Sequence, residues 1–173
     1  NYRMSEICAA VGLAQVEKLK TFVKKRIFAG LSFYKLIKRS GTKLLIPQKT
    51  PKKYTHSYFT FAAIFNGSQR GIKWQEFRKK FMSYGGDGIY AAWKTVDNEI
   101  PFKKARNNDL LSGSIKISKS YGWGQTPIAH KLQKKLMQFT TNQQNTLEVK
   151  KQINALKKTL SFFESKIVSK KIS

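Results

Sequence analysis

The chain has 173 residues, 40% hydrophobic and 13% aromatic, which is enough apolar material for one domain with its own core and excludes a disordered chain. One cysteine and two histidines exclude a disulfide framework and a zinc cluster made from these ligands. The apolar runs are too short for a membrane span, so we expect a cytoplasmic protein with no membrane partner.

The formal net charge of +25 is the usual footprint of a nucleic-acid-binding protein. Arginine, which suits bidentate recognition of phosphates and bases, contributes only six of the 34 basic residues. The lysines are spread along the whole chain instead of forming one stripe. We therefore assign most of them to solvated faces, and keep a basic nucleic-acid-binding module as an alternative function.

The first four residues, Asn1 to Met4, form a polar lead that runs directly into a helical pattern. It begins abruptly, without an initiator Met, so we expect the chain to start inside a larger protein. Ser5 suits an N-cap and Glu6 suits the positive end of a helix dipole. Cys8, among apolar neighbours, is expected to be a small buried hydrophobe. Apolar residues in steps of three or four predict one long helix that ends near Ser40–Gly41: Val16, Leu19, Val23, Ile27, Leu31, Tyr34 and Ile37.

Aromatic residues dominate the next part of the chain. After a proline-containing loop at 41–53, the stretch from His56 to Phe65 predicts a strand that is buried on most of both sides. Asn66–Gly67 predicts a turn. Aromatic residues at helical spacing between Trp74 and Tyr84 then predict a short amphipathic helix that packs on the sheet.

The glycine-rich segment Gly85–Gly88 has two possible interpretations. Glycines allow backbone N–H groups to approach a phosphate, but no Gly-Lys-Ser/Thr follows and the preceding element is a predicted helix. We favour a helix C-terminus that turns into a second strand at 89–93. Residues 98–125 are expected to form a long loop.

The C-terminal part predicts two helices and a third strand. Thr126–Pro127 suits a helix start, with Ile128, Leu132 and Leu136 on its inner face, and a short strand is expected at 136–139. Thr146 is expected to cap a last helix that packs on the sheet instead of forming a coiled-coil dimer. Its apolar seam comprises Val149, Ile153, Leu156, Leu160, Phe163 and Ile167.

These elements predict an α/β fold, in which a long N-terminal helix and a small, mainly antiparallel sheet are packed by further helices. The opening residues, Asn1-Tyr2-Arg3-Met4-Ser5-Glu6 and then 9–16, closely resemble a signature of the DegT/DnrJ/EryC1/StrS sugar aminotransferases. Segments 85–93 and 126–133 resemble later parts of that family in matching order.

The resemblance implies a pyridoxal-phosphate (PLP) enzyme with the aspartate aminotransferase fold (fold type I), of which this chain is the C-terminal part. Residues 1–40 would link an absent large PLP domain to a small α/β subdomain at 41–165, and 166–173 would be a Lys-rich tail. The complete enzyme would transfer an amino group, with glutamate as the expected donor, to a nucleotide-linked keto-sugar in amino-deoxy-sugar or surface polysaccharide biosynthesis. An inactive truncated remnant is a further alternative.

The resemblance also implies site residues. Asn1 would reach the PLP phosphate of the neighbouring subunit in a homodimer with a shared active site, and Arg3, Tyr90 and Trp93 would contact substrate. A salt bridge at the helix start is the alternative role for Arg3. The sequence at Trp93 departs from the His-containing substrate loop of many family members, and His130 replaces a commoner acidic residue and is expected at the surface. The Schiff-base lysine would lie before Asn1, so no catalytic residue is expected in this chain, which alone should be inactive.

Overall fold

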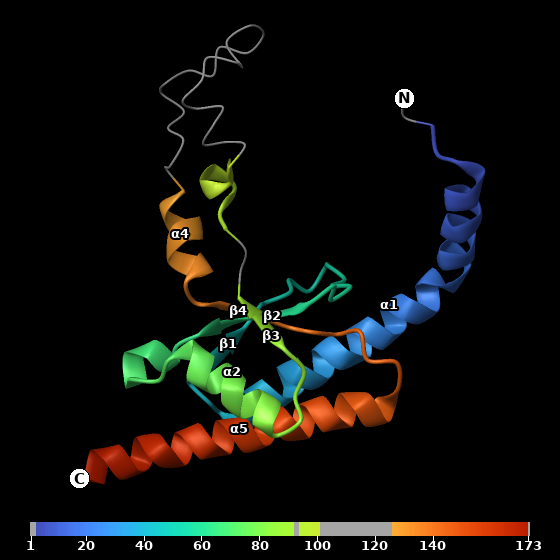
Figure 1. Cartoon of the computed structure of the whole chain (residues 1–173). Coiled ribbons are helices and arrows are strands. Elements are labelled where there is room, and N and C mark those ends of the chain that lie inside the picture. Colours follow the sequence, from blue (N-terminus) through green and yellow to red (C-terminus); the bar gives the residue numbers. More distant parts are fainter. Residues whose placement is uncertain (1–2, 92–93, 101–125, 173) are drawn as a thin grey trace, which may run out of the picture.

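The computed structural model describes residues 3–91, 94–100 and 126–172 (Figure 1). Its elements are, in chain order, α1 (Glu6–Ser40), β1 (Leu45–Pro47), β2 (Phe61–Phe65), the 3-10 helix η1 (Gly67–Arg70), α2 (Trp74–Ser83), β3 (Ile89–Ala91), the 3-10 helix η2 (Val96–Asn98), α4 (Pro127–Gln133), β4 (Leu136–Phe139) and α5 (Thr146–Ile172). None of the helices in these ranges is long and apolar enough to cross a membrane.

Four strands form one antiparallel sheet in the order β1-β2-β4-β3. Its register places Phe61 opposite Phe139 and Ala63 opposite Met137, and all four side chains are buried. The neighbouring residues on the strands, such as Ile46 and Tyr90, face the other side and are exposed. On β2 itself Ala62 and Ile64 are half-buried, so the predicted burial on both sides holds fully for one face of this strand and in part for the other.

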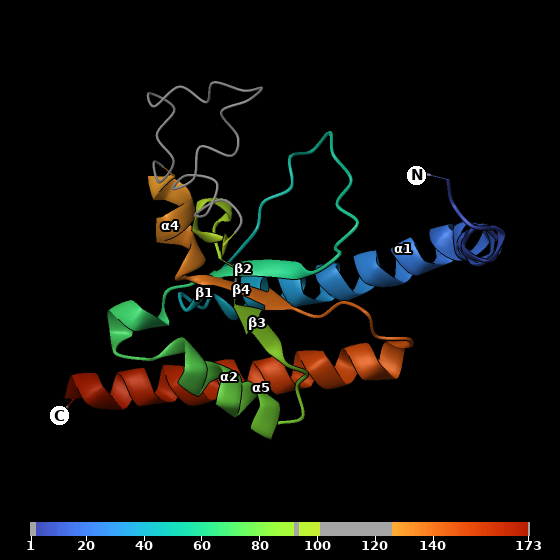
Figure 2. The ribbon, with the colours of Figure 1, turned by 45° about the horizontal axis from the view of Figure 1, so that its top comes forward.

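Helices α1, α2 and α5 cover the buried face (Figures 1 and 2). Phe33 of α1 stacks on Phe61 with ring centroids 5.4 Å apart, and it also meets Phe139. Phe77 of α2 bridges Phe65 of the sheet and Phe163 of α5. Aromatic contacts therefore connect all three helices to one core, as the predicted α/β class requires.

The limits of α1 agree with the sequence. The Ser5 Oγ accepts a hydrogen bond from the Cys8 N–H at 3.3 Å, and Gly41 ends the helix with φ 63°, in the left-handed region that glycine favours. Only the second half of α1 reaches the core. Cys8 is exposed, contrary to expectation, because the first half of the helix projects beyond the sheet (Figures 1 and 2).

Three other local predictions required correction in the strands and loops. Strand β2 begins only at Phe61, because Tyr58 adopts φ 51° and interrupts the extended backbone. Strand β1 lies inside the predicted loop and pairs with β2. Asn66–Gly67 leads into η1 instead of a simple turn.

The C-terminal helices differ from prediction mainly at their surfaces. Ile128 is 74% exposed and Leu132 39% exposed, so α4 buries no inner face, although β4 forms where the third strand was expected. The cap of α5 is Asn145, not Thr146, because its Oδ1 accepts from the Glu148 N–H at 2.9 Å. Helix α5 packs against α1 and α2 along the predicted seam and continues through Ile172, beyond the expected start of the tail.

Candidate functional site

The polar lead into α1 is the first candidate site. Asn1, the principal sequence-based candidate, lies outside the described residues, as does Trp93. Arg3 is exposed, just before the N-cap Ser5. The unpaired N–H groups at a helix N-terminus carry partial positive charge, so this end of α1 and the Arg3 guanidinium both favour an anion.

Tyr90 lies on β3, at an edge of the sheet and opposite Gln138. It is 56% exposed on the open face, so its ring and hydroxyl are accessible to a ligand. Figures 1 and 2 both place the start of α1 well away from β3. Within one chain, therefore, Arg3 and Tyr90 do not meet in a single site.

The glycine-rich segment is occupied by a structural network around Asp87. The Asp87 backbone N–H donates to Gln152 Oε1 at 2.7 Å, and its carboxylate Oδ2 accepts from Thr140 Oγ1 and Gln143 Nε2. A carboxylate here would repel a phosphate, and the Asp87 N–H is already used. These contacts support the interpretation as a turn between α2 and β3 and argue against a phosphate loop.

The glycines of this segment have packing roles. A Cβ on Gly86 would lie 2.4 Å from the Phe81 ring, closer than real Cβ atoms approach other atoms. Gly85 has φ 85°, in the left-handed region that other residues rarely adopt. Both positions require glycine to reverse the chain at the end of α2.

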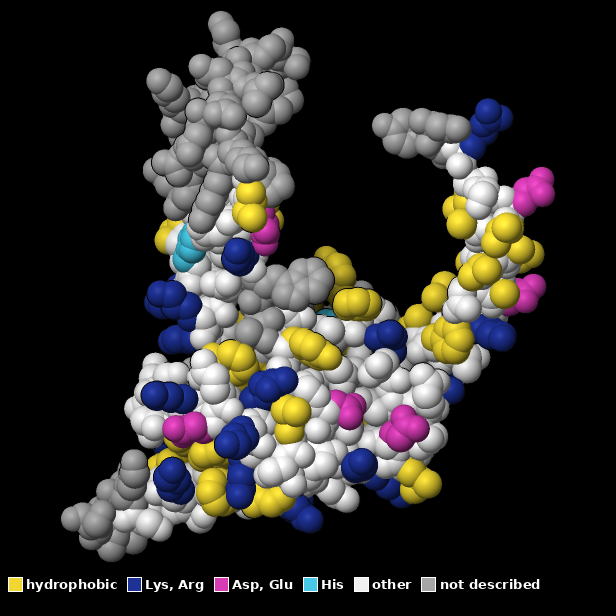
Figure 3. All heavy atoms as spheres, in the orientation of Figure 1, with side chains coloured by type: hydrophobic (Ala, Val, Ile, Leu, Met, Phe, Trp, Pro, Cys, Tyr) yellow, Lys and Arg dark blue, Asp and Glu magenta, His cyan; other side chains and the backbone are white. Residues whose placement is uncertain are grey.

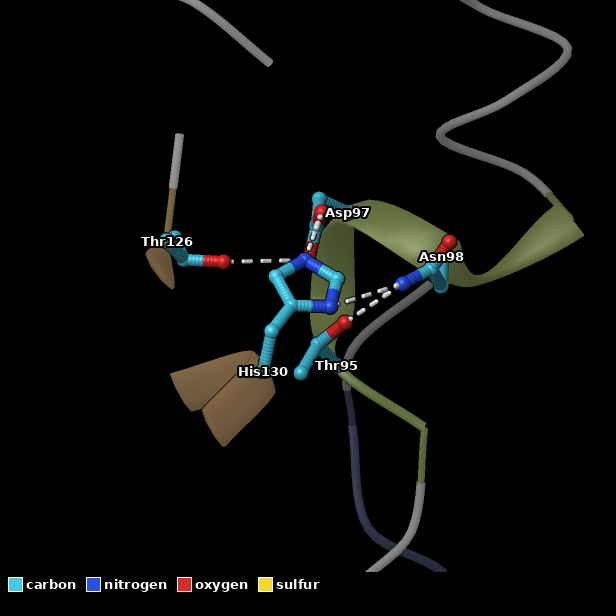
Figure 4. Close-up of polar contacts among 5 residues, drawn as sticks. All are labelled: Thr95, Asp97, Asn98, Thr126 and His130. Carbon is cyan, nitrogen blue, oxygen red and sulfur yellow. Dashed lines mark hydrogen bonds and ion pairs between the residues drawn. The ribbon is translucent and has the colours of Figure 1, made fainter. Parts of the chain in front are cut away.

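A second polar cluster, which sequence reasoning missed, joins η2 to α4 (Figure 4). His130 Nε2 lies 2.8 Å from Asp97 Oδ2, and Thr126 Oγ1 donates to Asp97 Oδ1 at 3.3 Å. Asn98 Nδ2 donates to Thr95 Oγ1 at 2.8 Å and lies 3.5 Å from His130 Nδ1. His130 lies at the surface as expected, with its side chain 36% exposed, and is in addition paired with an acid.

Asp97 is the electrostatic centre of this cluster. Side-chain hydrogen bonds from Thr95 and then His130 hold the pKa of Asp97 below its usual value, because they stabilise the charged carboxylate. Thr126 donates to Asp97 and not to His130, so its hydroxyl is not activated by the imidazole as a nucleophile would be. The arrangement therefore fixes η2 to α4 and does not form a catalytic triad.

The sequence carried only a weak signal for this cluster. Asp97 is one of nine acidic residues in a strongly basic chain, and it stands two residues after Thr95, whose hydroxyl can form a local side-chain turn. Its partner His130 lies 33 residues further on. A separation of that length shows no periodicity from which the pairing could be read.

Comparison with known proteins identifies the first half of the chain. The profile of the DegT/DnrJ/EryC1/StrS aminotransferase family matches residues 1–89. No curated protein matches the chain.

Several solved structures share its fold. PseC from Helicobacter pylori, an aminotransferase of pseudoaminic acid biosynthesis, has a TM-score of 0.65 and 16% identity, covering 93% of this chain and 38% of PseC. An aminotransferase from Psychrobacter cryohalolentis has a TM-score of 0.66 and 16% identity, covering 93% of this chain and 40% of its own. The sugar aminotransferase CalS13 from Micromonospora echinospora has a TM-score of 0.65 and 10% identity, covering 91% of this chain and 37% of its own. The chain thus has part of the sugar aminotransferase fold and spans about two-fifths of these proteins.

Proposed function

Because the chain belongs to the DegT/DnrJ/EryC1/StrS aminotransferase family, we propose that it is the C-terminal part of a PLP-dependent sugar aminotransferase. The complete enzyme would transfer an amino group from an amino acid, glutamate in our proposal, to a nucleotide-linked keto-sugar. The observation that carries this proposal is the family match over residues 1–89, within which the polar lead and α1 lie.

The residues at the start of α1 fit the phosphate end of PLP. Arg3 supplies a permanent positive charge there, and the helix N-terminus favours an anion, although Glu6 in the first turn opposes it. In the proposal, Asn1 donates its side-chain amide to this phosphate in the neighbouring subunit. Bound PLP would supply the electron sink for amino transfer, while Asn1 and Arg3 would only bind the phosphate of PLP and orient the cofactor.

The exposed first half of α1 supports a larger assembly. Residues 7–16 carry no charged side chain, and Figure 3 shows hydrophobic side chains along the visible face of this projecting segment. Exposed apolar residues here include Ile7, Val11, Leu13, Val16 and Leu19, at 52–80% exposure. A helix that is apolar around its circumference is normally buried, so we propose that the large PLP domain and a second subunit cover it.

A shared active site in this assembly would account for the separation of Arg3 and Tyr90 within one chain. If Asn1 and Arg3 serve the neighbouring subunit, then Tyr90 and Trp93 of that neighbour could complete the same shared site with substrate. We also propose a cytoplasmic location. The catalytic lysine would come from residues before Asn1, and the chain alone would be inactive.

The proposal is tested on the protein that includes the residues encoded before Asn1. Purified with PLP, it should show the visible absorbance of protein-bound cofactor and aminate a nucleotide-linked keto-sugar. The variant Asn1→Ala should weaken PLP binding by about tenfold, roughly the effect of losing one hydrogen bond to a charged group. The matched control Asn142→Ala, on an exposed loop, should bind PLP normally. A protein with neither cofactor absorbance nor amino transfer would refute the proposal.

A further inference from the structure

An open groove of about 810 Å³ lies between α5 and Tyr84, the residue that caps the C-terminus of α2. Figures 1 and 2 both place α2 and the middle of α5 away from the start of α1. The groove is lined by Tyr84, Asn154, Lys157, Lys158, Ser161, Phe162 and Ser165. Its floor is one face of α5, where the residues follow helical spacing. Neither the aminotransferase proposal nor the core packing uses this groove.

Lys80 of α2 lies beside the groove and contacts both of the aromatic residues that line it. Lys80 Nζ lies 4.1 Å from the centre of the Phe162 ring on α5 and 4.8 Å from that of Tyr84, at the end of α2. An ammonium between two aromatic rings is held by cation–π attraction. Lys80 is therefore positioned beside the groove instead of sweeping freely through solvent.

The groove has positive charge without a compensating acid. Its lining contains Lys157 and Lys158, both exposed, and neither Asp nor Glu. Across the part of the chain that the structure describes, Lys80, Lys157 and Lys158 make no ion pair with a carboxylate. Asn154, Ser161 and Ser165, which also line the groove, are short and uncharged and leave room for a ligand beside the two lysines.

We propose that this groove binds a carboxylate-rich segment of a partner protein. Its acidic side chains would pair with Lys80, Lys157 and Lys158, and an apolar side chain would pack against the exposed edge of Phe162. Charge complementarity of this kind sets the orientation of a bound segment and speeds its association.

Two other occupants fit the groove less well. Single-stranded nucleic acid needs free aromatic faces for base stacking and favours arginine, but Lys80 covers a face of both rings and no arginine lines the groove. A second copy of this chain has only 9 acidic residues against 34 basic ones, so it offers few carboxylates that could pair with the lysines of this groove.

The test measures binding of a fluorescein-labelled oligoglutamate peptide to the 173-residue chain by fluorescence anisotropy at physiological ionic strength. The variant Lys80→Gln/Lys157→Gln/Lys158→Gln should raise Kd by about tenfold, the combined effect of three exposed ion pairs. The control Lys18→Gln/Lys20→Gln/Lys24→Gln removes the same charge from exposed positions on α1 and should change Kd by less than about twofold.

Folding of each variant is checked by its thermal melt. If the groove variant does not fold, Lys157→Gln/Lys158→Gln, at two exposed positions, takes its place with an expected rise of several-fold. Equal weakening by the control variant would show that only net charge matters and would overturn the proposal. So would an oligothymidylate of equal charge that binds more tightly through the same lysines, or the absence of oligoglutamate binding. None of these outcomes bears on the aminotransferase proposal, since the groove lies apart from the polar lead.

Discussion

At the scale of single residues, the least predictable feature is the backbone at Tyr58. This buried residue has φ 51°, which is uncommon for any residue other than glycine. Its N–H donates to His56 Nδ1 at 2.8 Å, and Thr141 Oγ1 donates to its carbonyl oxygen. The Tyr58 ring lies over Gly30 of α1, so the conformation depends on His56 nearby in the sequence and on two distant parts, Gly30 and Thr141. No local pattern could have indicated it.

Gly30 and Gly12 provide a matched pair within α1. A Cβ on Gly30 would lie 2.3 Å from the Tyr58 ring, whereas nothing lies within 4 Å of a Cβ on Gly12. We expect Gly30→Ala to lower the free energy of unfolding by about 1–3 kcal/mol through overpacking. Gly12→Ala should raise it by up to about 1 kcal/mol through helix propensity. Urea unfolding of both variants measures this, and equal effects in the two would contradict the close contact with Tyr58.

Asp97 should make stability depend on pH in the acid range. Its pKa is lowered in the folded chain, so the ionised carboxylate stabilises the fold above the unfolded value of about 3.9. That contribution is lost as the pH falls through the lowered pKa. Asp97→Asn should therefore be less stable than the unmodified chain at neutral pH and equally stable in strong acid. The comparison uses urea unfolding across this range.

An NMR titration identifies the cause of the Asp97 shift. Thr95→Val removes the largest contributor and should move the carboxyl pKa back toward its usual value. An Asp97 pKa that is ordinary in the unmodified chain, or insensitive to Thr95→Val, would show that the cluster in Figure 4 does not form in solution.

At the scale of elements, helices were predictable where their periodicity and end signals agreed. Gly41 ends α1 at the expected place, and the seam of α5 is buried as its spacing indicated. Prediction failed where a short element depended on its neighbours. Strand β1 has only 3 residues and exists because β2 pairs with it, and α4 has apolar residues that meet no covering layer among the described parts.

Two substitutions at the start of α5 test whether Asn145 or Thr146 caps this helix. Asn145 and Glu148 bond reciprocally, because Asn145 Nδ2 also donates to Glu148 Oε1 at 2.8 Å. Asn145→Ala should cost about 1 kcal/mol of stability, whereas Thr146→Ala should cost less than about 0.5 kcal/mol. Thermal unfolding distinguishes them. A larger loss of stability for Thr146→Ala than for Asn145→Ala would show that Thr146 is the cap, as the sequence had predicted.

A second pair contrasts α5 with α4. Leu156 is fully buried, so Leu156→Ala should cost about 2–5 kcal/mol through the cavity it leaves. Ile128→Ala, at a position 74% exposed, should change stability by less than about 0.5 kcal/mol. Chemical denaturation of the chain measures both. A large loss for Ile128→Ala would mean that α4 has a covered face after all.

At the scale of the whole molecule, composition and patterning predicted the α/β class, while resemblance of a few short motifs predicted the family. The match over residues 1–89 confirms that family, and the structural match to PseC covers 93% of this chain. The candidate site could be predicted less well than the family, because Arg3 and Tyr90 lie on separated elements. The Asp97–His130 pair joins segments that no sequence spacing relates.

The most direct test of the central claim is amino transfer by the protein that includes the residues encoded before Asn1. With PLP, glutamate and a nucleotide-linked keto-sugar, we predict an aminated sugar nucleotide and 2-oxoglutarate in equal amounts, and at subsaturating PLP a lower rate for Asn1→Ala but not for Asn142→Ala. A protein that binds no PLP and forms neither product with any keto-sugar nucleotide would contradict the account.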